Sequence, residues 1–334
     1  MSKNTIIIHS GEDNQTGFIR LFFPTFIANS KFYNGGLKVE QHWHPIQDGE
    51  LLKDVQSIVI QRPISERDAQ LVRFYAGYRN TYKYNIVFEW DDILWDCYPE
   101  QMKTVQSIAD IPNFVVCSTR RLAKEWKKIS SRPTVVLPNG VAAYSCADIH
   151  QPTLEHIEKP VVLYGGSLGH ENDFWDNWKD ALNSMIEKNE IEFHSFVKPN
   201  FIQNSSKITL HDFTTPVEWM NTISKIHPDI YIAPLENSLF NKCKSDLKVK
   251  EAGAMGCVFL GSDFADSPYS YVPKDMLVKE NDDVCLKILN LCKPLVYNEN
   301  RQWLRDAYIN KHWNITDNQF MLKWFEAYSN GREV

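Results

Sequence analysis

The chain has 334 residues, 43% of them hydrophobic, which is enough for two domains of ordinary size with a core each. Its formal net charge of −6 excludes a surface that is basic throughout, as a general polyanion binder requires. Residues 1–150 hold 17 basic and 16 acidic side chains and the rest hold 19 and 26, so a positive surface is expected in the N-terminal half.

Short apolar runs alternate with helical patterns along the chain, which predicts parallel sheets covered by helices. The expected strands are 5–9, 37–41, 57–61, 85–89, 114–118, 134–137, 161–165, 191–196, 208–211, 230–233 and 258–260. Residues 142–159 lack a strong period and form the expected linker. The predicted fold class is α/β, with two doubly wound domains and a cleft between their strand ends.

Two loops after strands contain glycine and polar residues. The first contains Gly17, and Arg20 lies one turn further along an expected helix. The other, in the second domain, contains Gly166 and Ser167, with His170 three residues later. Glycine lets the backbone approach a ligand closely, and the amides of such a loop can hold phosphate. Both loops are candidate phosphate contacts, although glycine turns after strands are common and an arginine on a helix is often a surface or ion-paired residue.

Two stretches of the N-terminal half, 67–84 and 120–128, combine basic with aromatic side chains. Basic faces of this kind can grip phosphates while aromatic rings stack on an extruded base, and ordinary solvated helix faces have the same composition. The candidate acceptor-binding residues are Arg73, Arg79, Arg120 and Arg121.

Asp91 and Asp92 follow the expected strand 85–89, so they lie at its carboxyl end, the usual place for a site in open α/β sheets. A carboxylate there can take the proton of an attacking hydroxyl. Two other interpretations stay open, since aspartate is common in helix caps and turns and a pair of aspartates can bind a divalent cation. We expect no metal, because the lysines suited to phosphate lie about 150 residues further along.

The stretch 229–256 predicts a buried strand, a lysine-rich loop and a helix that begins near Ser245. Lys248 and Glu251 lie about one turn apart on this helix, so both side chains can reach one ligand. A helix N-terminus attracts anions, and Lys244 would add positive charge. Glu251 can accept hydrogen bonds from both hydroxyls of a ribose, whereas a solvated ion pair with Lys248 is the simpler alternative.

This stretch resembles the donor-binding segment of group 1 (family 4-like) nucleotide-sugar glycosyltransferases, which have the GT-B fold. The resemblance is carried by Asp229, Pro234-Leu235, Phe240-Asn241, Lys244-Ser245, Leu247-Lys248 and Glu251-Ala252. Residues 17–24, 117–141 and 164–173 match the same families in the same order.

The resemblance implies two Rossmann-like domains, an acceptor-side domain at 1–145 and a nucleotide-sugar-binding domain at 160–310. The tail at 311–334 would return to the first domain, with a cap on the second domain as the alternative. The implied co-substrate is a nucleotide sugar, most simply a UDP-sugar, and no cofactor is expected to stay bound. The implied activity is hexosyl or pentosyl transfer to an acceptor hydroxyl.

A second resemblance concerns the acceptor. Residues 91–94, 162–167 and 247–255 are similar to segments of the T-even phage DNA β-glucosyltransferases, which modify 5-hydroxymethylcytosine in duplex DNA. That pattern has an arginine where this chain has Lys248, and a single aspartate where it has Asp91-Asp92. The leading prediction is therefore transfer to 5-hydroxymethylcytosine in phage DNA, and the alternative is the assembly of a polysaccharide or cell-surface glycan.

Sequence features that are typical of secreted and membrane proteins are absent, which bears on where in the cell the protein is expected. The seven cysteines show no paired spacing, the N-terminus has no signal-peptide pattern, and no apolar run reaches the length of a membrane span. These features predict a cytoplasmic protein, in the host cytoplasm if a phage encodes it, with a nucleotide sugar and duplex DNA as partners and no membrane. A non-catalytic nucleotide-sugar-binding protein and a sugar-nucleotide epimerase remain as other classes.

Overall fold

The computed structural model describes residues 4–10, 18–32, 38–141, 155–166, 172–212 and 215–333. Three expected donor contacts, Gly17, Ser167 and His170, lie outside these residues. The chain divides into two compact units. Unit 1 comprises Met1–Gly140, Cys243–Ser245 and Ile315–Val334, and unit 2 comprises Val141–Lys242 and Asp246–Asn314.

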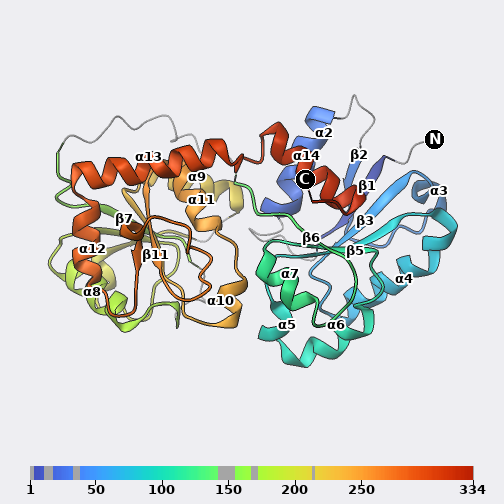
Figure 1. The fold of residues 1–334 in the computed structure, drawn as a ribbon, viewed down its shortest axis with the longest axis horizontal. Coiled ribbons are helices and arrows are strands. Elements are labelled where there is room, and N and C mark those ends of the chain that lie inside the picture. The colour runs from blue at the N-terminus through green and yellow to red at the C-terminus, as the bar shows by residue number, and fades with distance from the viewer. Residues whose placement is uncertain are drawn as a thin grey trace. The chain divides into compact units, whose positions relative to one another are not determined.

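Unit 1 is built on a six-stranded parallel sheet in the order β2-β1-β3-β4-β5-β6 (Figure 1). Its strands are β1 (Thr5–His9), β2 (Lys38–Gln41), β3 (Val55–Gln61), β4 (Asn85–Trp90), β5 (Phe114–Cys117) and β6 (Thr134–Val136). Its α-helices are α2 (Phe23–Phe32), α3 (Gly49–Leu52), α4 (Glu66–Tyr82), α5 (Leu94–Cys97), α6 (Met102–Ile108), α7 (Arg120–Trp126) and α14 (Asn318–Asn330). Strand β1 is buried along its whole length, as in parallel sheets covered on both faces.

Unit 2 has a second six-stranded parallel sheet, in the order β12-β11-β10-β7-β8-β9. Its strands are β7 (Val161–Tyr164), β8 (Glu192–Ser195), β9 (Ile208–Leu210), β10 (Ile230–Ala233), β11 (Val258–Ser262) and β12 (Leu277–Val278). Its α-helices are α8 (Asp176–Glu187), α9 (Pro216–Ile226), α10 (Leu239–Cys243), α11 (Leu247–Met255), α12 (Val284–Leu291) and α13 (Pro294–Asn310). The expected α/β class with two parallel sheets is confirmed.

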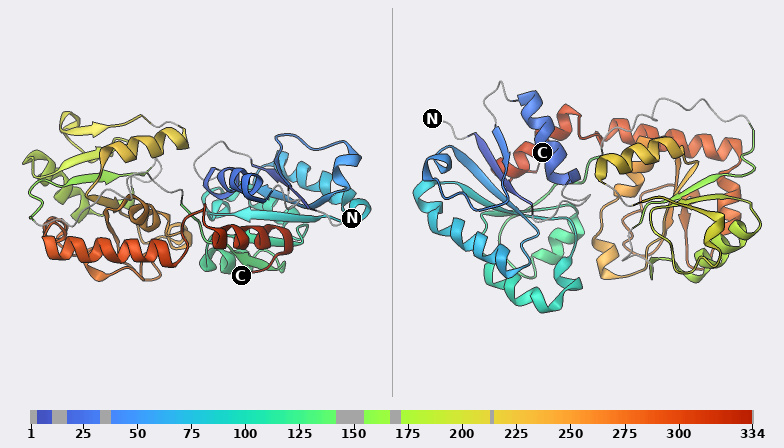
Figure 2. Two further views of the ribbon diagram at one scale, coloured as in Figure 1. Left: turned by 90° about the horizontal axis from the view of Figure 1, so that it is seen from above. Right: turned by 180° about the vertical axis from the view of Figure 1, so that it is seen from behind.

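The last helix, α14, packs in unit 1. It lies against β3 and α2, and Figure 2 shows α14 and α2 in the same unit. The Trp324 indole donates to the backbone carbonyl of Arg20 at 2.9 Å, and the Ser57 hydroxyl donates to the carbonyl of Ser329 at 3.4 Å. The C-terminal residues therefore complete the core of unit 1 and hold the segment that carries Arg20.

Helix α4 starts directly after β3 because a capping box ends the loop between them. The Ser65 hydroxyl accepts a hydrogen bond from the Asp68 amide at 3.2 Å, and the Asp68 carboxylate accepts one from the Ser65 amide at 2.9 Å. The helix ends at Lys83, whose φ of 58° is left-handed. The capping box thus keeps residues 62–68 at the carboxyl end of the sheet.

Helix α11 begins two residues later than expected, at Leu247, with Asp246 as its N-cap residue. The Asp246 carboxylate does not cap the helix, because it pairs with Lys250 at 2.8 Å and accepts from the Tyr271 hydroxyl at 2.7 Å. Gly253 allows close packing on α13, since a Cβ there would lie 3.0 Å from the carbonyl oxygen of Leu304. Within the described residues, no helix combines the length and the apolar character that crossing a membrane requires.

Candidate active site

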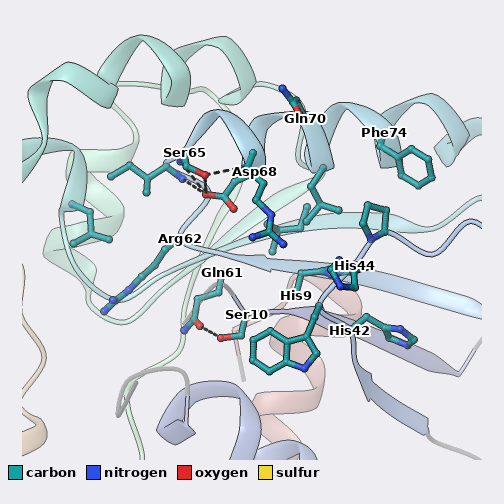
Figure 3. A pocket seen from close by; sticks show the side chains of 17 residues that line it. His9, Ser10, His42, His44, Gln61, Arg62, Ser65, Asp68, Gln70 and Phe74 are labelled. Carbon is teal, nitrogen blue, oxygen red and sulfur yellow. Dashed lines mark hydrogen bonds between the residues drawn. The ribbon is translucent and has the colours of Figure 1, made fainter. Parts of the chain in front are cut away.

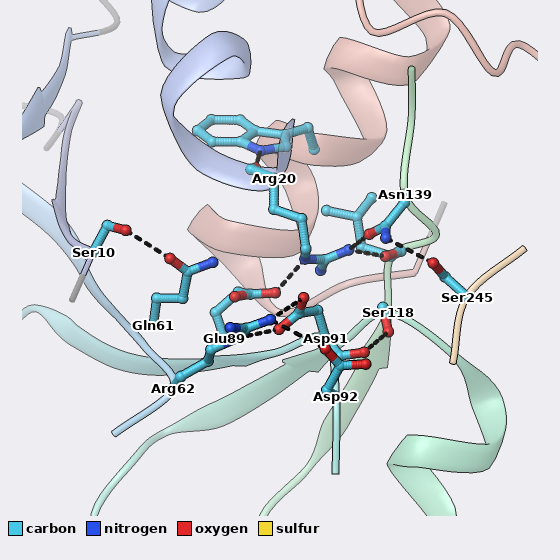
Figure 4. A network of polar contacts seen from close by, with 12 residues as sticks. Ser10, Arg20, Gln61, Arg62, Glu89, Asp91, Asp92, Ser118, Asn139 and Ser245 are labelled. Atoms are coloured by element: carbon cyan, nitrogen blue, oxygen red, sulfur yellow. Dashed lines mark hydrogen bonds and ion pairs between the residues drawn. The ribbon is translucent and has the colours of Figure 1, made fainter. Parts of the chain in front are cut away.

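A network of buried charges lies at the carboxyl end of the unit 1 sheet (Figure 4). The Arg20 guanidinium donates to Glu89 and to the Asn139 side chain, and it donates to the Leu137 carbonyl at 3.0 Å. Asn139 in turn donates to the Ser245 hydroxyl at 2.8 Å. Arg20, expected to face a diphosphate, is thus buried and bonded within unit 1, where it neutralises Glu89.

Asp91 and Asp92, adjacent in sequence, have different surroundings. Asp91 accepts two hydrogen bonds from the Arg62 guanidinium, at 2.5 and 2.6 Å, and its side chain is only 5% exposed. Asp92 accepts one bond from Arg62, at 3.2 Å, and its side chain is 24% exposed. Asp91 is therefore an anchor for Arg62, and Asp92 is the more accessible carboxylate of the two.

Arg62 is a site residue that the sequence analysis missed. It follows β3, which pairs with β4, and its amide donates to the Glu89 carbonyl at 2.9 Å. Its φ of 48° is left-handed, a conformation that is uncommon for arginine and turns its side chain toward the end of the neighbouring strand. One feature of the sequence could have indicated it: Arg62 directly follows the expected strand 57–61, and the next expected strand, 85–89, ends just before Asp91.

The lysine and glutamate of α11 lie together in unit 2, as their spacing predicts. Lys248 Nζ is 3.0 Å from Glu251 Oε2, and the Tyr231 hydroxyl donates to the same oxygen at 2.8 Å. Lys248 also lies over the rings of Trp219 and Tyr231, with its Nζ 5.3 Å from each centroid. The Glu251 side chain is fully buried, yet Oε1 has no hydrogen-bond partner among the described residues.

The other expected donor contacts divide between the units. Gly166 follows β7 in unit 2, and a Cβ there would lie 2.1 Å from the Tyr164 hydroxyl, so only glycine fits without a rearrangement. The preceding Gly165 is equally restricted, with a Cβ 2.2 Å from the Tyr231 hydroxyl. Lys244 is partly exposed and belongs, like Ser245, to the short segment of the chain that clusters with unit 1.

The basic residues expected to bind an acceptor mostly have protein partners. Arg73 bonds to Glu66 and Ser107 at 2.8 Å each, Arg79 donates to the Ile111 carbonyl at 2.7 Å, and Arg121 lies 3.4 Å from Glu125. Arg120 is exposed in the first turn of α7. Three of the four expected acceptor-binding arginines are therefore engaged in hydrogen bonds or ion pairs with other residues of unit 1.

The aromatic residues expected beside these arginines divide between the core and the surface of unit 1. Tyr75 and Trp126 are fully buried, and Tyr84 is nearly so. Trp126 packs edge-on against Phe88 of β4, with the ring centroids 6.3 Å apart. Tyr78, in contrast, is 45% exposed, and its ring centroid lies 5.1 Å from that of Phe74. Stacking of exposed rings on an extruded base therefore stays a prediction.

His9, at the end of β1, is buried beside Tyr75, whose hydroxyl accepts from the Ile46 amide at 2.9 Å and lies 2.8 Å from His9 Nε2. Burial lowers the pKa of His9 from 6.5 to about 4, against a smaller raising effect of a hydrogen bond to the His42 backbone. His9 is therefore neutral in the folded protein at pH 7.

This pKa predicts a loss of stability in acid. Between pH 6.5 and about 4 the unfolded chain binds a proton at His9 that the folded chain does not, so stability falls as the pH is lowered through this window. The full effect of His9 is about 3 kcal/mol. Urea unfolding across this range should show a weaker pH dependence for His9→Gln than for the unmodified protein. Exposed His44 provides the control, and a His9→Gln slope equal to that of His44→Gln would contradict the prediction.

Among the described residues, no group of three or more His, Cys, Asp or Glu side chains is arranged to hold a metal ion. Asp91 and Asp92 are instead bonded to the Arg62 guanidinium. The chemistry that these residues offer is thus a positioned carboxylate in unit 1 and, in unit 2, a buried glutamate paired with a half-buried lysine.

Comparison with known proteins relates this geometry to a fold family. No protein-family model matches the chain, and no curated protein matches it in sequence. Among solved structures, a glycosyltransferase from Rickettsia africae ESF-5 matches with a TM-score of 0.61 at 13% identity, over 98% of both chains. Anabaena Alr3699/HepE in complex with UDP-glucose matches with a TM-score of 0.63 at 10% identity, over 97% of this chain and 98% of that one.

A third structure is a putative UDP-N-acetylglucosamine 2-epimerase from Listeria monocytogenes, with a TM-score of 0.55 at 11% identity, over 98% of this chain and 96% of that one. Matches at such low identity establish the fold and leave the activity to be argued from the site. The fold is the GT-B type, with two Rossmann-like domains, as the resemblance in the sequence implied.

Proposed function

We propose that this protein is a glycosyltransferase that moves a sugar from a UDP-sugar to an acceptor hydroxyl. The GT-B fold supports this proposal, as do the two neighbours named as a glycosyltransferase and as a complex with UDP-glucose. In this proposal unit 2 holds the nucleotide sugar and unit 1 holds the acceptor.

The observation that carries the proposal is the buried carboxylate of Glu251. Its Oε2 is used by Lys248 and Tyr231, whereas Oε1 is buried and unpartnered among the described residues. A buried polar atom without a partner is costly, so a ligand hydroxyl is the expected complement. A ribose of the nucleotide would supply that hydroxyl, and Lys248 would lie close to the diphosphate.

The reaction divides between the two units. The acceptor oxygen forms a bond to the anomeric carbon, the bond from that carbon to the diphosphate breaks, and UDP leaves with the electron pair. Lys248 stabilises the charge that develops on the diphosphate, helped by Lys244, Ser245 and the Gly166 turn. Asp92 takes the proton from the acceptor hydroxyl. Gly17, Ser167 and His170 complete the proposed donor contacts.

Arg62 positions the base. Its Nε and Nη2 atoms each donate a hydrogen bond to Asp91, and Nη2 also donates one to Asp92. A guanidinium fixed in this way limits the rotation of the Asp92 carboxylate.

The sequence-derived acceptor, 5-hydroxymethylcytosine in duplex DNA, remains a proposal to be tested against a saccharide. An acceptor screen with labelled UDP-sugars, read by mass spectrometry, would offer DNA containing 5-hydroxymethylcytosine, unmodified DNA and a saccharide mixture. Sugar on the hydroxymethylated DNA alone would establish the first acceptor. Transfer only to saccharides would establish glycan assembly, and transfer to none of them would contradict both acceptors.

An epimerase is the second candidate, because the Listeria structure named as a putative epimerase matches nearly the full length of both chains. An epimerase converts UDP-N-acetylglucosamine without any acceptor. Incubation of the protein with this nucleotide sugar alone, followed by analysis of the sugar product, distinguishes the two functions. An altered sugar that is still attached to UDP would replace the glycosyltransferase proposal.

Removal of the Glu251 carboxylate should weaken donor binding. Glu251→Ala is expected to raise the Kd for UDP roughly 5- to 150-fold, which is a loss of about 1 to 3 kcal/mol of binding free energy, because the ribose loses its buried hydrogen-bond acceptor. Isothermal titration with UDP measures this, and Glu251→Gln tests the charge at constant volume. Glu299→Gln, an exposed change on α13, is the control. An unchanged Kd in a folded Glu251→Ala protein would remove the ribose assignment.

A further inference from the structure

A cavity of about 590 Å³ lies within unit 1, at the carboxyl ends of β1, β2 and β3 and beside the first turns of α4 (Figure 3). This is the end of an open α/β sheet where ligands bind, and the volume suits a small organic ligand. Its lining combines aromatic, histidine and uncharged polar side chains, among them His9, Ser10, Trp43, Gln61 and Phe74.

Trp43 offers an aromatic face to this cavity. It lies in the bend after β2, between His42 and His44, and 52% of its surface is exposed. A tryptophan that contributes to the core is usually far more buried, so about half of this indole serves no packing within the described residues. An exposed indole at the edge of a polar cavity suits a ring that is apolar on one face and hydroxylated at its rim, which describes a pyranose.

The inner wall of the cavity supplies neutral hydrogen-bonding groups. The Ser10 hydroxyl donates to Gln61 Oε1 at 2.7 Å, while Gln61 Nε2 has no partner among the described residues. Gln61 is only 4% exposed, so this amide is a buried donor that a ligand oxygen would satisfy. Buried His9 adds an uncharged ring. Such groups match hydroxyls, which both donate and accept.

The charge of the cavity comes mainly from Arg67. The guanidinium of Arg62, also in the lining, is neutralised by Asp91 and Asp92, and the Asp68 carboxylate is occupied by the capping box. Arg67 is exposed and forms no ion pair with any residue that the structure describes. It also lies in the first turn of α4, where the helix dipole disfavours a cation. Local structure therefore does not account for this arginine, whereas an anionic ligand in the cavity would.

We propose that this cavity binds the acceptor, and that the acceptor is an anionic saccharide. Its pyranose ring stacks on Trp43, its hydroxyls bond to Gln61 and Ser10, and its carboxylate or phosphate pairs with Arg67. The identification as an acceptor site rests on the proposed function. Arg62 connects the cavity with the proposed catalytic base, since it lines the cavity and donates a hydrogen bond to Asp92.

The test compares two glycosides that differ only in charge, methyl β-D-glucoside and methyl β-D-glucuronide. Their Kd values for the full-length protein are measured by ligand-observed NMR in the presence of UDP. Trp43→Ala should weaken both glycosides by roughly 10-fold or more, the scale of one lost aromatic contact. Arg67→Gln should weaken the glucuronide by roughly 10-fold and leave the glucoside unchanged, because only the glucuronide carries a carboxylate.

Matched control variants separate the cavity from the general surface. Phe26→Ala removes an aromatic side chain of unit 1 that is 63% exposed and lies outside the cavity lining. Arg332→Gln removes an exposed arginine of unit 1 that also lies outside the lining. Both should bind the glycosides as the unmodified protein does. The proposal is overturned if neither glycoside binds, if Arg67→Gln affects both glycosides equally, or if Arg332→Gln matches Arg67→Gln.

Two further outcomes of the binding experiment distinguish a failure of the saccharide site from a failure of the proposed function. If UDP fails to bind while the glycosides follow the predicted pattern, the donor assignment fails and the saccharide site is supported. If a duplex oligonucleotide with 5-hydroxymethylcytosine binds in place of the glycosides and Trp43→Ala weakens it, the saccharide class is wrong. Unfolding transitions of all the variants verify that each is folded.

Discussion

Replacement of Asp92 by asparagine is expected to lower kcat for sugar transfer by roughly 10²- to 10⁴-fold, the usual contribution of a general base. The change keeps the size of the side chain and its bond to Arg62 but removes the group that accepts the proton. Since the donor contacts lie elsewhere in the chain, the Kd for UDP should stay the same. Steady-state kinetics with saturating donor, together with UDP titration, measures both quantities.

Asp91→Asn is the matched control. Asp91 makes two bonds to Arg62 and is nearly buried, so its replacement leaves that guanidinium without most of its counter-charge. The expected result is a lower unfolding temperature and a smaller loss of kcat than for Asp92→Asn. A folded, stable Asp91→Asn protein without activity, beside an active Asp92→Asn protein, would reverse the two assignments.

The second large effect concerns stability. Arg20→Met should lower the free energy of unfolding of unit 1 by about 3 to 5 kcal/mol, the cost of breaking a buried ion pair by removing one partner. Glu89 would be left fully buried without its cation. Burial already raises the pKa of Glu89, and Arg20 opposes that rise, so the variant should recover part of the loss by protonating Glu89. Denaturant unfolding followed by fluorescence measures the change.

Two comparisons make this test specific. The double variant Arg20→Met with Glu89→Leu removes both charges, so it should be more stable than Arg20→Met alone. Arg73→Met removes an exposed partner of Glu66, and its cost should stay below about 1 kcal/mol. If Arg20→Met costs no more than Arg73→Met, the buried pair does not stabilise unit 1. Because the chain has two units, two transitions are expected to be resolved, and only one of them should shift.

The secondary structure was largely predictable because it depends on local patterns. The apolar run of β1 is buried throughout, as expected of a strand covered on both faces, and the spacing of Lys248 and Glu251 places them in contact at 3.0 Å. Strand β12 was missed because it has only two residues, too few to show a period. The start of α11 was placed two residues too early, and the Asp246 carboxylate, instead of capping the helix, pairs with Lys250 of the same helix and accepts from the distant Tyr271 hydroxyl.

The roles of individual site residues depended on contacts between distant parts of the chain. Asp91 and Asp92 are chemically identical in the sequence, and only the pairing of β3 with β4 brings Arg62 against Asp91 and leaves Asp92 more accessible. Likewise, only the fold shows that Arg20 pairs with Glu89, 69 residues away, and its role as a phosphate contact stays a prediction. The sequence by itself determined the α/β class, the strands other than β12 and the Lys248–Glu251 pair, because periodicity and i,i+3 spacing act over a few residues. Tertiary packing decided how Arg20, Arg62, Glu89 and Asp91 are neutralised inside unit 1, because a buried charge loses its solvent and gains its partner only when distant segments pack together.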